Sequence, residues 1–529
     1  MAEKNVLLKR KWYLYLTEFF SGMSVMAVEL GASRLLAPYF SSSQIVWTII
    51  IGTIMISMAL GNIYGGKSAD KDPDPDKLYG RILVAAVWIA AIPFLGKFVI
   101  IGISALLVMT VNTNFLIWAA FITCMVVFVY PLFLLGTVTP SLVKYTVDSL
   151  DDSGKTVGTL GAFNTIGSII GTFVPTFISI PTVGTAWTFI IFSGILLILG
   201  LAYFIAEKSG RVKCGVSAAL FLVCCVSSNT LGFAFWDKDI VYEGESVYNY
   251  LQVKDNEVHT ALSTNVLFGV QSIYMKAGGL TGMYYDYAMA APLMTENDNK
   301  DILILGMGTG TYSKQCLTYF DNVTVEGVEI DDKIIDLAYD YFELPENVKV
   351  TEYDGRAFLN VCDKKYDVIM VDAYQDITIP FQMSSREFFG LVKGCLKENG
   401  VMVVNMNMRS KNSDGINYWL SDTIADVFPN VYSVDVSRST NRELFASENA
   451  DIIGIFEENI DKLHDSELIS MMNVVAHDVE RYENGDKILT DDKAPVELLG
   501  MNVIDDIISE ELVYYRKEFE EKGISGLME

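Results

Sequence analysis

The chain has 529 residues, enough for two or three domains, and a formal net charge of −26. Residues 1–236 carry 15 Lys and Arg against 11 Asp and Glu, a net charge of +4, so the remainder carries −30. An acidic part of this size argues against nucleic acid as a partner and is compatible with a cationic substrate such as a polyamine. The seven cysteines form no CxxC pair and there are three histidines, so the sequence supports neither a metal site nor a disulfide framework.

The first 236 residues are predicted to form a multi-pass transmembrane domain. Seven apolar stretches follow one another, each near or above the roughly 20 residues that a helix needs to cross a bilayer. The first is too long, and too closely followed by others, to be a cleaved signal peptide. We therefore expect about seven spans and the lipid bilayer as a partner. The stretches are approximately 12–38, 44–66, 82–112, 114–137, 157–180, 184–206 and 214–236.

Basic residues mark alternate loops of this domain. If 82–112 crosses once, they lie in the loops reached after zero, two, four and six crossings, which places the N-terminus in the cytoplasm and the part after 236 outside. Two alternatives return that part to the cytoplasm: 82–112, interrupted by Pro93 and Lys97, crosses twice, or 214–236 is re-entrant. The clusters are Lys4/Lys9/Arg10/Lys11, Lys67/Lys71/Lys77/Arg81, Lys144/Lys155 and Lys208/Arg211/Lys213.

Two acidic residues interrupt the first apolar stretch. Glu18 and Glu29 are eleven residues apart, close to three helical turns, so they share one helix face, with Arg34 near its end. One interpretation is a path for a cation or polyamine; the one we favour puts Glu18 at headgroup depth and pairs Glu29 with a neighbouring helix. Gly167 and Gly171 form a GxxxG pattern that indicates close helix packing.

The soluble part is predicted to begin with β-hairpins and to continue as an α/β sheet. Residues 237–280 alternate over short runs separated by a polar turn at 254–257, which favours a small antiparallel β-domain. A helix over about 281–294 precedes alternating strands and helices, so we expect 281–529 to be a Rossmann-like, mostly parallel, doubly wound domain. Its expected strands are Asp301–Leu305, Val323–Ile330, Val348–Glu352, Tyr366–Asp372 and Gly400–Met406.

The strongest motif is a glycine turn after the first of these strands. Gly306, Gly308 and Gly310 alternate where an apolar run ends, and Glu329 follows 19 residues after Gly310. Glycines let a ligand approach bare backbone, and a carboxylate on the next strand can accept both hydroxyls of a ribose. Dinucleotide oxidoreductases need a third glycine at the position of Thr311, so the spacing favours an S-adenosyl cofactor over NAD.

Further acidic residues follow the next strands. Asp354 and Gly355 can form an adenine site, although an Asp-Gly turn is nearly as good an account of the pair. Asp372 ends an apolar strand, with Tyr374 and Asp376 shortly after it. Two carboxylates there can hold a cationic amine and remove its proton, and the alternative is a loop cap or a solvated turn. The neighbouring glycine turn favours the functional interpretation.

At these residues the chain resembles the spermidine synthases, or polyamine aminopropyltransferases, and in particular their bacterial membrane-fused branch. The resemblance extends over nearly the whole length. In the membrane half it lies in residues 29–40 and 59–66. In the soluble half it lies in Gln271-Ser272, Tyr284, the glycine turn, Val328–Asp331, Asp354-Gly355 and Tyr366–Asp372.

The resemblance implies transfer of an aminopropyl group from decarboxylated S-adenosylmethionine to a diamine such as putrescine, without a metal. Asp372 would then be the proton acceptor, while Glu329 and Asp354 would hold the ribose and the adenine. The amine would lie among Gln271, Tyr284, Tyr285, Tyr374 and Asp376. Because the donor is made in the cytoplasm, we expect the soluble part there, against the simplest count of spans. A homodimer is compatible with the resemblance.

Several departures from the family concern the donor's transferable group. Thr309 stands where the family's glycine turn carries an Asp, Tyr285 where a Gln or His is usual, and Asn249 near an expected Gln. The loop from Asp372 to Asp376 is also longer. A lost charge-assisted hydrogen bond is worth roughly 1.5–3 kcal/mol, so use of intact S-adenosylmethionine stays open. The alternatives are therefore a methyltransferase, or a transporter or sensor that binds a polyamine or nucleoside without turnover.

Overall fold

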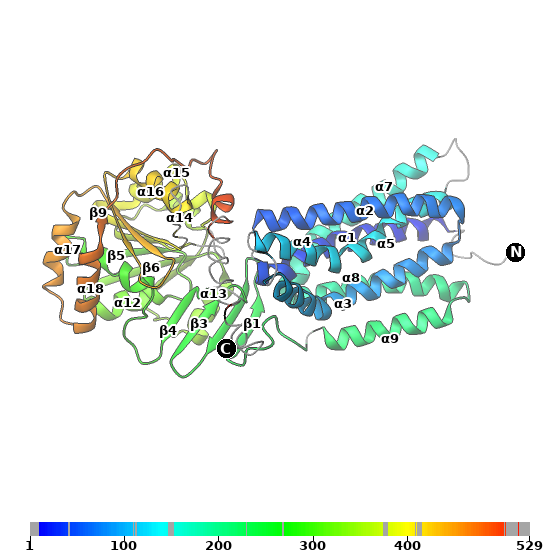
Figure 1. Ribbon diagram of the computed structural model, residues 1–529, viewed down its shortest axis with the longest axis horizontal. Helices are drawn as coiled ribbons and strands as arrows, with labels where there is room; N and C mark the ends of the chain where they lie inside the picture. Colours follow the sequence, from blue (N-terminus) through cyan, green and yellow to red (C-terminus); the bar gives the residue numbers. More distant parts are fainter. Residues whose placement is uncertain are drawn as a thin grey trace. The chain divides into compact units, whose positions relative to one another are not determined.

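The computed structural model describes residues 10–40, 43–108, 111, 114–146, 153–228, 230–266, 269–373, 379–407, 409, 415–501, 503 and 517. The chain divides into two compact units, Met1–Lys238 and Asp239–Glu529. They are called here the helical unit and the catalytic unit, the second because the sequence predicts the catalytic residues to lie in it, and each is described by itself. Figure 1 shows helices running alongside one another in the first, and two sheets with flanking helices in the second.

Every described part of the expected spans is largely helical, and a helix satisfies its own backbone polar groups, as a segment that crosses a bilayer has to do. Within the described residues, four helical runs are long and apolar enough to cross a membrane, or five if the bent run from Phe115 to Thr146 is one span. The helices are α1 (Lys11–Phe40), α2 (Gln44–Lys71), α3 (Pro75–Val108), α4 (Phe115–Val127), α5 (Val129–Gly136), α6 (Val138–Thr146), α7 (Ser153–Val174), a π-helical turn η1 (Pro175–Ser179), α8 (Ile180–Ala206) and α9 (Arg211–Ser227).

Three helical runs bear on the expected number of crossings: α7 to α8, α3 and α9. The run Ser153–Ala206 has 54 residues, far more than one crossing needs, and its backbone leaves helical geometry at Gly184 (φ 80°, ψ 170°), where two expected spans meet. In contrast, α3 is one continuous helix through Pro93, so the alternative in which 82–112 forms two short segments is not observed. Helix α9 has 17 residues, fewer than the expected stretch 214–236.

Small residues let α7 lie directly against α1. A Cβ built on Gly167 would lie 2.0 Å from the carbonyl oxygen of Phe19, and one on Gly171 would lie 2.1 Å from that of Met23. Only glycine permits such an approach of two backbones. The close packing predicted from the GxxxG pattern is therefore present, and its partner is the first helix of the chain.

The loops expected on the basic side gather at one end of the helical unit. Lys144 at the end of α6 forms an ion pair of 2.9 Å with Asp70 near the end of α2, and the Tyr203 hydroxyl of α8 donates to Asp76 at the start of α3. By contrast, Tyr39 at the far end of α1 donates to the carbonyl of Phe233, which follows α9. Chain segments before and after α9 thus lie at opposite ends of this unit.

The catalytic unit opens with an antiparallel sheet in the order β1-β2-β3-β4, as the alternating sequence predicts. Its strands are β1 (Ile240–Glu245), β2 (Tyr250–Asp255), β3 (His259–Ser263) and β4 (Ser272–Met275). Leu251, Val253 and Leu262 pack on Leu337 and Phe342, in and just beyond α13 (Asp332–Tyr341). This apolar contact fastens the small sheet beside the larger one.

The second sheet has eight strands in the order β12-β10-β11-β9-β8-β5-β6-β7. Strands β7, β6, β5, β8 and β9 are parallel and correspond to the five predicted strands; β10, β11 and β12 pair antiparallel at one edge and were not predicted. The strands are β5 (Lys300–Leu305), β6 (Val323–Glu329), β7 (Lys349–Glu352), β8 (Tyr366–Val371), β9 (Leu396–Met406), β10 (Asn430–Asp435), β11 (Arg442–Ser447) and β12 (Glu480–Arg481).

Helices cover both faces of this sheet, with α12, α17 and α18 on one side and α14, α15 and α16 on the other (Figure 1). The expected helix 281–294 is two short helices that meet at Met289. The remaining elements are α10 (Tyr284–Ala288), α11 (Ala290–Leu293), α12 (Thr311–Tyr319), α14 (Gly355–Val361), a 3-10 turn η2 (Phe381–Met383), α15 (Arg386–Cys395), α16 (Ile416–Val427), α17 (Ile452–Ile460) and α18 (Ser466–Asp478).

The strand order reverses between β5 and β8. Chain connections leave these neighbours in opposite directions along the sheet, since β6 and β7 lie beyond β5 while β9 lies beyond β8. A crevice opens at the carboxyl ends of the strands at such a point, and open α/β sheets bind ligands there. The fold therefore directs attention to the residues just after Leu305 and Val371.

Candidate active site

The glycine turn after β5 has the backbone that its sequence predicts. Gly306, Gly308 and Gly310 have φ angles of 79°, 58° and 86°, in a region that side-chain-bearing residues rarely adopt. A Cβ on Gly306 would lie 2.7 Å from the carbonyl oxygen of Asp372. The turn thus touches the end of β8, which brings the predicted cofactor motif and the predicted catalytic carboxylate together.

Glu329 at the end of β6 is held by backbone N–H groups. Gly308 donates to Oε2 at 2.9 Å, while Ile330 and Asp331 donate to Oε1 at 2.9 and 3.1 Å. Burial raises the pKa of this carboxyl group, and the three backbone hydrogen bonds oppose that rise. Its orientation is therefore fixed by the glycine turn and by its own strand end.

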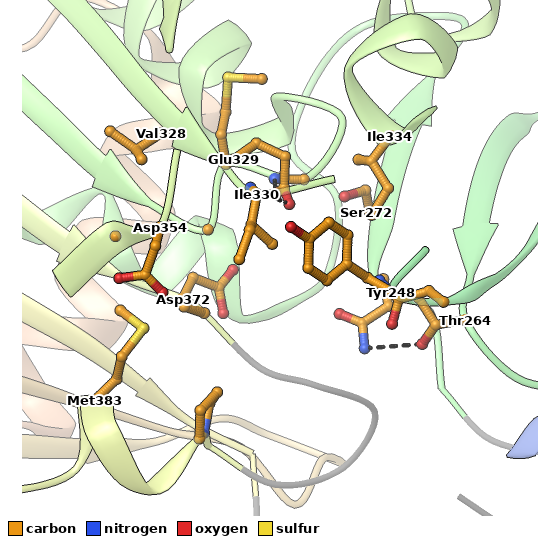
Figure 2. A pocket seen from close by; sticks show the side chains of 18 of the residues that line it. Tyr248, Thr264, Ser272, Val328, Glu329, Ile330, Ile334, Asp354, Asp372 and Met383 are labelled. Carbon is orange, nitrogen blue, oxygen red and sulfur yellow. Dashed lines mark hydrogen bonds between the residues drawn. The ribbon is translucent and has the colours of Figure 1, made fainter. Parts of the chain in front are cut away.

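Asp354 caps a helix and also lines the pocket. Its Oδ1 accepts from the backbone N–H of Ala357 at 2.7 Å and caps the N-terminus of α14, which begins at Gly355. Both Asp354 and Gly355 also line the pocket. Figure 2 shows the side chains of Glu329, Asp354 and Asp372 around the same hollow.

Asp372 lies at the centre of a small polar network. The Tyr284 hydroxyl donates to Oδ2 at 2.6 Å, and Asn405 Nδ2 on β9 donates to Oδ1 at 2.8 Å. Burial, with a smaller contribution from the charge of Glu329, raises the pKa of Asp372 to about 7, and the two hydrogen bonds moderate the rise. A carboxyl group with that pKa exchanges protons near neutral pH.

Two tyrosines of α10 form the wall next to Asp372. The rings of Tyr284 and Tyr285 have centroids 4.0 Å apart, and the Tyr285 hydroxyl donates to the carbonyl of Gln271 at 2.6 Å. Burial raises the pKa of both hydroxyls, so each stays protonated as a hydrogen-bond donor. Gln271 Nε2 donates a long hydrogen bond of 3.4 Å to Thr264 Oγ1, just after β3, drawn as a dashed line in Figure 2.

One pocket collects most of the residues predicted from the sequence. Tyr284 donates to Asp372, which lines the pocket, and Gly310 is the N-cap of α12 at the end of the turn. Tyr374 and Asp376 lie outside the described residues. The predicted residues that line the pocket are Gln271, Tyr285, Gly306, Gly308, Glu329, Asp354, Gly355 and Asp372.

The structure adds residues that the sequence did not single out for this site. Asn405 orients Asp372 and is itself held by Asn441 Nδ2 of the β10–β11 connection at 2.8 Å. Glu443 lies opposite Asn405 in the β9–β11 ladder, fully buried, and burial together with the charge of Asp372 raises its pKa well above the usual value. Asn405 could have been noticed in the sequence because it is a polar residue inside the apolar run of β9. The sequence around Glu443 gives no comparable sign that it lies near the site.

The part of the pocket beside the small sheet is polar and uncharged. Asn249, Thr264, Gln271 and Ser272 line it, while the carboxylates of the pocket lie on the α/β sheet. Thr309 is buried behind it, and its backbone N–H donates to Ser272 Oγ at 3.1 Å. Among the described residues, no group of three or more His, Cys, Asp or Glu side chains is placed to hold a metal ion.

Comparison with known proteins places this site in a family. The spermine/spermidine synthase domain matches residues 282–436. Over 345 residues the chain is 51% identical to the probable polyamine aminopropyl transferase of Bifidobacterium longum (strain NCC 2705), covering 62% of this chain and 77% of that protein. The chain belongs to the polyamine aminopropyltransferase family. The polyamine aminopropyltransferase of Vibrio vulnificus (strain CMCP6) is 26% identical over 237 residues, which cover 43% of this chain and 77% of that protein.

Solved structures with some likeness include members of the same family. Spermidine synthase from Thermotoga maritima aligns with a TM-score of 0.36 and 21% identity, over 43% of this chain and 79% of its own. Human methyltransferase-like protein 13 in complex with SAH aligns with a TM-score of 0.30 and 18% identity, over 38% of this chain and 95% of its own. As a polyamine aminopropyltransferase family member the chain is an enzyme, and the pocket at the β5–β8 crevice is its candidate active site.

Proposed function

We propose that the catalytic unit transfers an aminopropyl group from decarboxylated S-adenosylmethionine to a diamine such as putrescine. The products are spermidine or a related polyamine and methylthioadenosine. Family membership supports the reaction class, and one observation of the site carries the proposal. Asp372, with a pKa of about 7, stands against the glycine turn, where a base for the amine is needed.

The donor's adenosyl part fits the residues on the α/β sheet. Two backbone hydrogen bonds converge on Oε1 of Glu329 and one on Oε2, so Oε2 retains more room to accept from a ribose hydroxyl. The second carboxyl oxygen of Asp354 is available to the adenine amino group, because its Oδ1 caps α14. The bare backbone of Gly306 and Gly308 permits close approach of the nucleoside.

Amine attack needs a neutral nitrogen, and most of a diamine is protonated at neutral pH. Asp372 accepts the proton from the ammonium group, while Tyr284 and Asn405 hold its two oxygens in place. The nitrogen then forms a bond to the aminopropyl carbon next to sulfur. The carbon–sulfur bond breaks, its electron pair remains on sulfur, and methylthioadenosine leaves. Glu329 and the glycine turn keep the adenosyl part fixed during this displacement.

Incubation of the purified full-length protein with each donor and a panel of diamines tests this proposal. Mass spectrometry should detect methylthioadenosine and an amine longer by one aminopropyl group when decarboxylated S-adenosylmethionine is present. Release of S-adenosylhomocysteine from intact S-adenosylmethionine, with a methylated amine, would instead identify a methyltransferase. Binding of amine and donor without any product would identify a sensor or transporter.

The methyltransferase remains a second candidate because of one observation. The side of the pocket next to the small sheet is uncharged, and Thr309, buried behind it, stands where the family resemblance leads one to expect an acidic residue. Methyl transfer needs no ammonium site on the transferred group. If Thr309→Asp raises the preference for decarboxylated donor by about tenfold or more, the missing carboxylate is what limits that preference.

We propose further that the helical unit anchors the enzyme in a membrane and that the catalytic unit faces the cytoplasm. The apolar length of the helices supports the anchor. The donor is made in the cytoplasm, which supports placing the catalytic unit on that side of the membrane. The proposal requires an even number of crossings. The count depends on α9, which has 17 residues and no buried side chain and is not one of the helical runs long and apolar enough to cross a membrane.

A further inference from the structure

Glu18 is a carboxylate buried inside the helical unit. Thr139 Oγ1 of α6 and Asn164 Nδ2 of α7 both donate to its Oε1, at 2.6 and 2.8 Å. Its relative exposure is 0%, and among the described residues no hydrogen-bond partner of Oε2 is found. The side chain is therefore enclosed by α1, α6 and α7. Its depth in a bilayer, which the sequence predicts to be that of the headgroups, stays a prediction.

The surrounding backbone is shaped around this carboxylate. A Cβ on Gly22, one helical turn after Glu18, would lie 2.6 Å from the carbonyl oxygen of Asn164, so glycine lets α7 reach the carboxylate. On the other side, Thr139 stands in the first turn of α6, two residues after Thr137, where α5 ends. Broken helices beside a buried charge are a recurrent arrangement at substrate and ion sites of membrane proteins.

The hydrogen-bond acceptors that remain around Glu18 define which kind of ligand the site can bind. Thr139 Oγ1 and Asn164 Nδ2 donate to Oε1, which leaves acceptor lone pairs on Thr139 Oγ1 and on Asn164 Oδ1, and Glu18 Oε2 supplies a third acceptor with charge. A primary ammonium group carries three N–H donors and a positive charge, which matches this set. Calcium and similar metal ions need about six or more oxygen ligands, which these three side chains do not provide.

We propose that Glu18, Thr139 and Asn164 form a binding site for the primary ammonium group of an alkyl amine within the helical unit. Thr139 and Asn164 are partly exposed whereas Glu18 is buried, so the amine reaches the carboxylate past these two side chains. Acidic residues inside membrane helices are costly and mark ion or substrate pathways. The inference uses no residue of the catalytic unit and does not depend on the proposed transfer reaction.

Labelling with dicyclohexylcarbodiimide, which attacks carboxyl groups in apolar surroundings, tests the site locally. Full-length protein in lipid nanodiscs is treated with the reagent, and mass spectrometry quantifies the adduct on the Glu18 peptide. Spermidine at about ten times its dissociation constant should lower the adduct by about tenfold, because occupied sites are shielded. Tetramethylammonium, which has no N–H donor, and sodium at equal charge should not. Glu29→Gln, which removes the other carboxylate of α1, should leave both the labelling of Glu18 and its protection unchanged.

Equilibrium dialysis with labelled spermidine gives a second readout. Glu18→Gln keeps an acceptor oxygen for Thr139 and Asn164, so the helices stay packed, yet the bound amine should fall by one equivalent per chain. This difference is expected whether or not the catalytic unit also binds amine, so failure of the proposed function and failure of this site are distinguishable. Equal protection by tetramethylammonium or sodium, or an unchanged stoichiometry in Glu18→Gln, would overturn the proposal.

Discussion

Glu329 connects the glycine turn to the pocket. Its carboxylate ties the glycine turn to the end of β6 and still lines the pocket. In the proposed complex a ribose hydroxyl would replace water at this carboxylate, and a carboxylate that is already oriented pays a smaller ordering cost on binding. The three backbone hydrogen bonds provide that orientation before any ligand arrives.

Replacement of this side chain should weaken the nucleoside site. We expect Glu329→Ala to reduce affinity for an adenosyl ligand by at least about tenfold, the effect of losing one or two hydrogen bonds to a charged group. Isothermal titration calorimetry with methylthioadenosine measures it, and far-ultraviolet circular dichroism serves as the control for folding. Unchanged affinity in a folded variant would remove Glu329 from the donor site.

Residues near strand ends could be predicted from the sequence because their signals are local. Glycine spacing, an apolar run and a following acid led to Gly306, Glu329 and Asp372, and the structure brings all three to one crevice. Asn405 could not be found in this way, because its contact with Asp372 spans 33 residues and depends on the pairing of β8 with β9. The register between two strands that are distant in the sequence cannot be read from the local pattern of either strand.

At the scale of elements, apolar runs predicted the parallel strands well. Strands β5, β8 and β9 are buried over most of their length, and each contains four consecutive residues that are Val, Ile, Leu or Met. Strand β6 is also mostly buried but mixes Val with Thr, Glu and Gly, and it was predicted from the acid at its end. The antiparallel strands β10 and β11 mix charged and apolar residues, so the same criterion missed them. The expected helix 281–294 is interrupted at Met289, between α10 and α11.

The α1–α7 contact offers a matched test of element packing. Leucine at Gly167 would be forced into the backbone of Phe19, whereas Gly161 on the same helix has open space around it. Overpacking typically costs about 1–3 kcal/mol, and here backbone rather than a flexible side chain must move. We therefore expect Gly167→Leu to lower the temperature at which the detergent-solubilised protein loses its monodisperse size-exclusion peak.

Gly161→Leu is the control for added bulk and hydrophobicity on the same helix. It should behave as the unmodified protein, because nothing lies within 4 Å of the added Cβ. If both variants lose stability equally, the effect comes from helix propensity or lipid contact, and the close packing of α1 on α7 is not what stabilises the unit.

At the scale of the whole molecule, two arguments disagree about the side of the membrane. The basic loops gather at one end of the helical unit, and the segment after α9 contacts Tyr39 at the other end, which favours an odd count of crossings. The donor is made in the cytoplasm, which favours a catalytic unit on that side. The proposed cytoplasmic side depends on α9, since the continuous α3 excludes a second crossing within 82–112.

A single engineered thiol can show on which side of the membrane the catalytic unit lies. Ser470 is exposed on α18, and Ser470→Cys in a background without other reactive thiols places one label site on the catalytic unit. With a membrane-impermeant maleimide, the cytoplasmic proposal predicts labelling only after lysis. Labelling of intact cells would place the catalytic unit outside and would require an exported donor.

The central claim is that Asp372 is the base for amine attack. The measurement is the single-turnover rate of unmodified enzyme and of Asp372→Asn at saturating decarboxylated S-adenosylmethionine and putrescine, across pH. Ionisation of the amine itself affects both proteins alike, so the ratio of the two rates isolates Asp372. Its pKa of about 7 means that the carboxyl is protonated, and unable to accept, at lower pH.

We therefore expect the ratio to rise with pH through a midpoint near 7 and to reach about a hundredfold or more above it, the usual contribution of a general base. Affinity for methylthioadenosine should be retained in Asp372→Asn, which shows that only the proton transfer is lost. A ratio close to one at every pH, with the donor bound normally, would contradict the account and place the proton acceptor elsewhere.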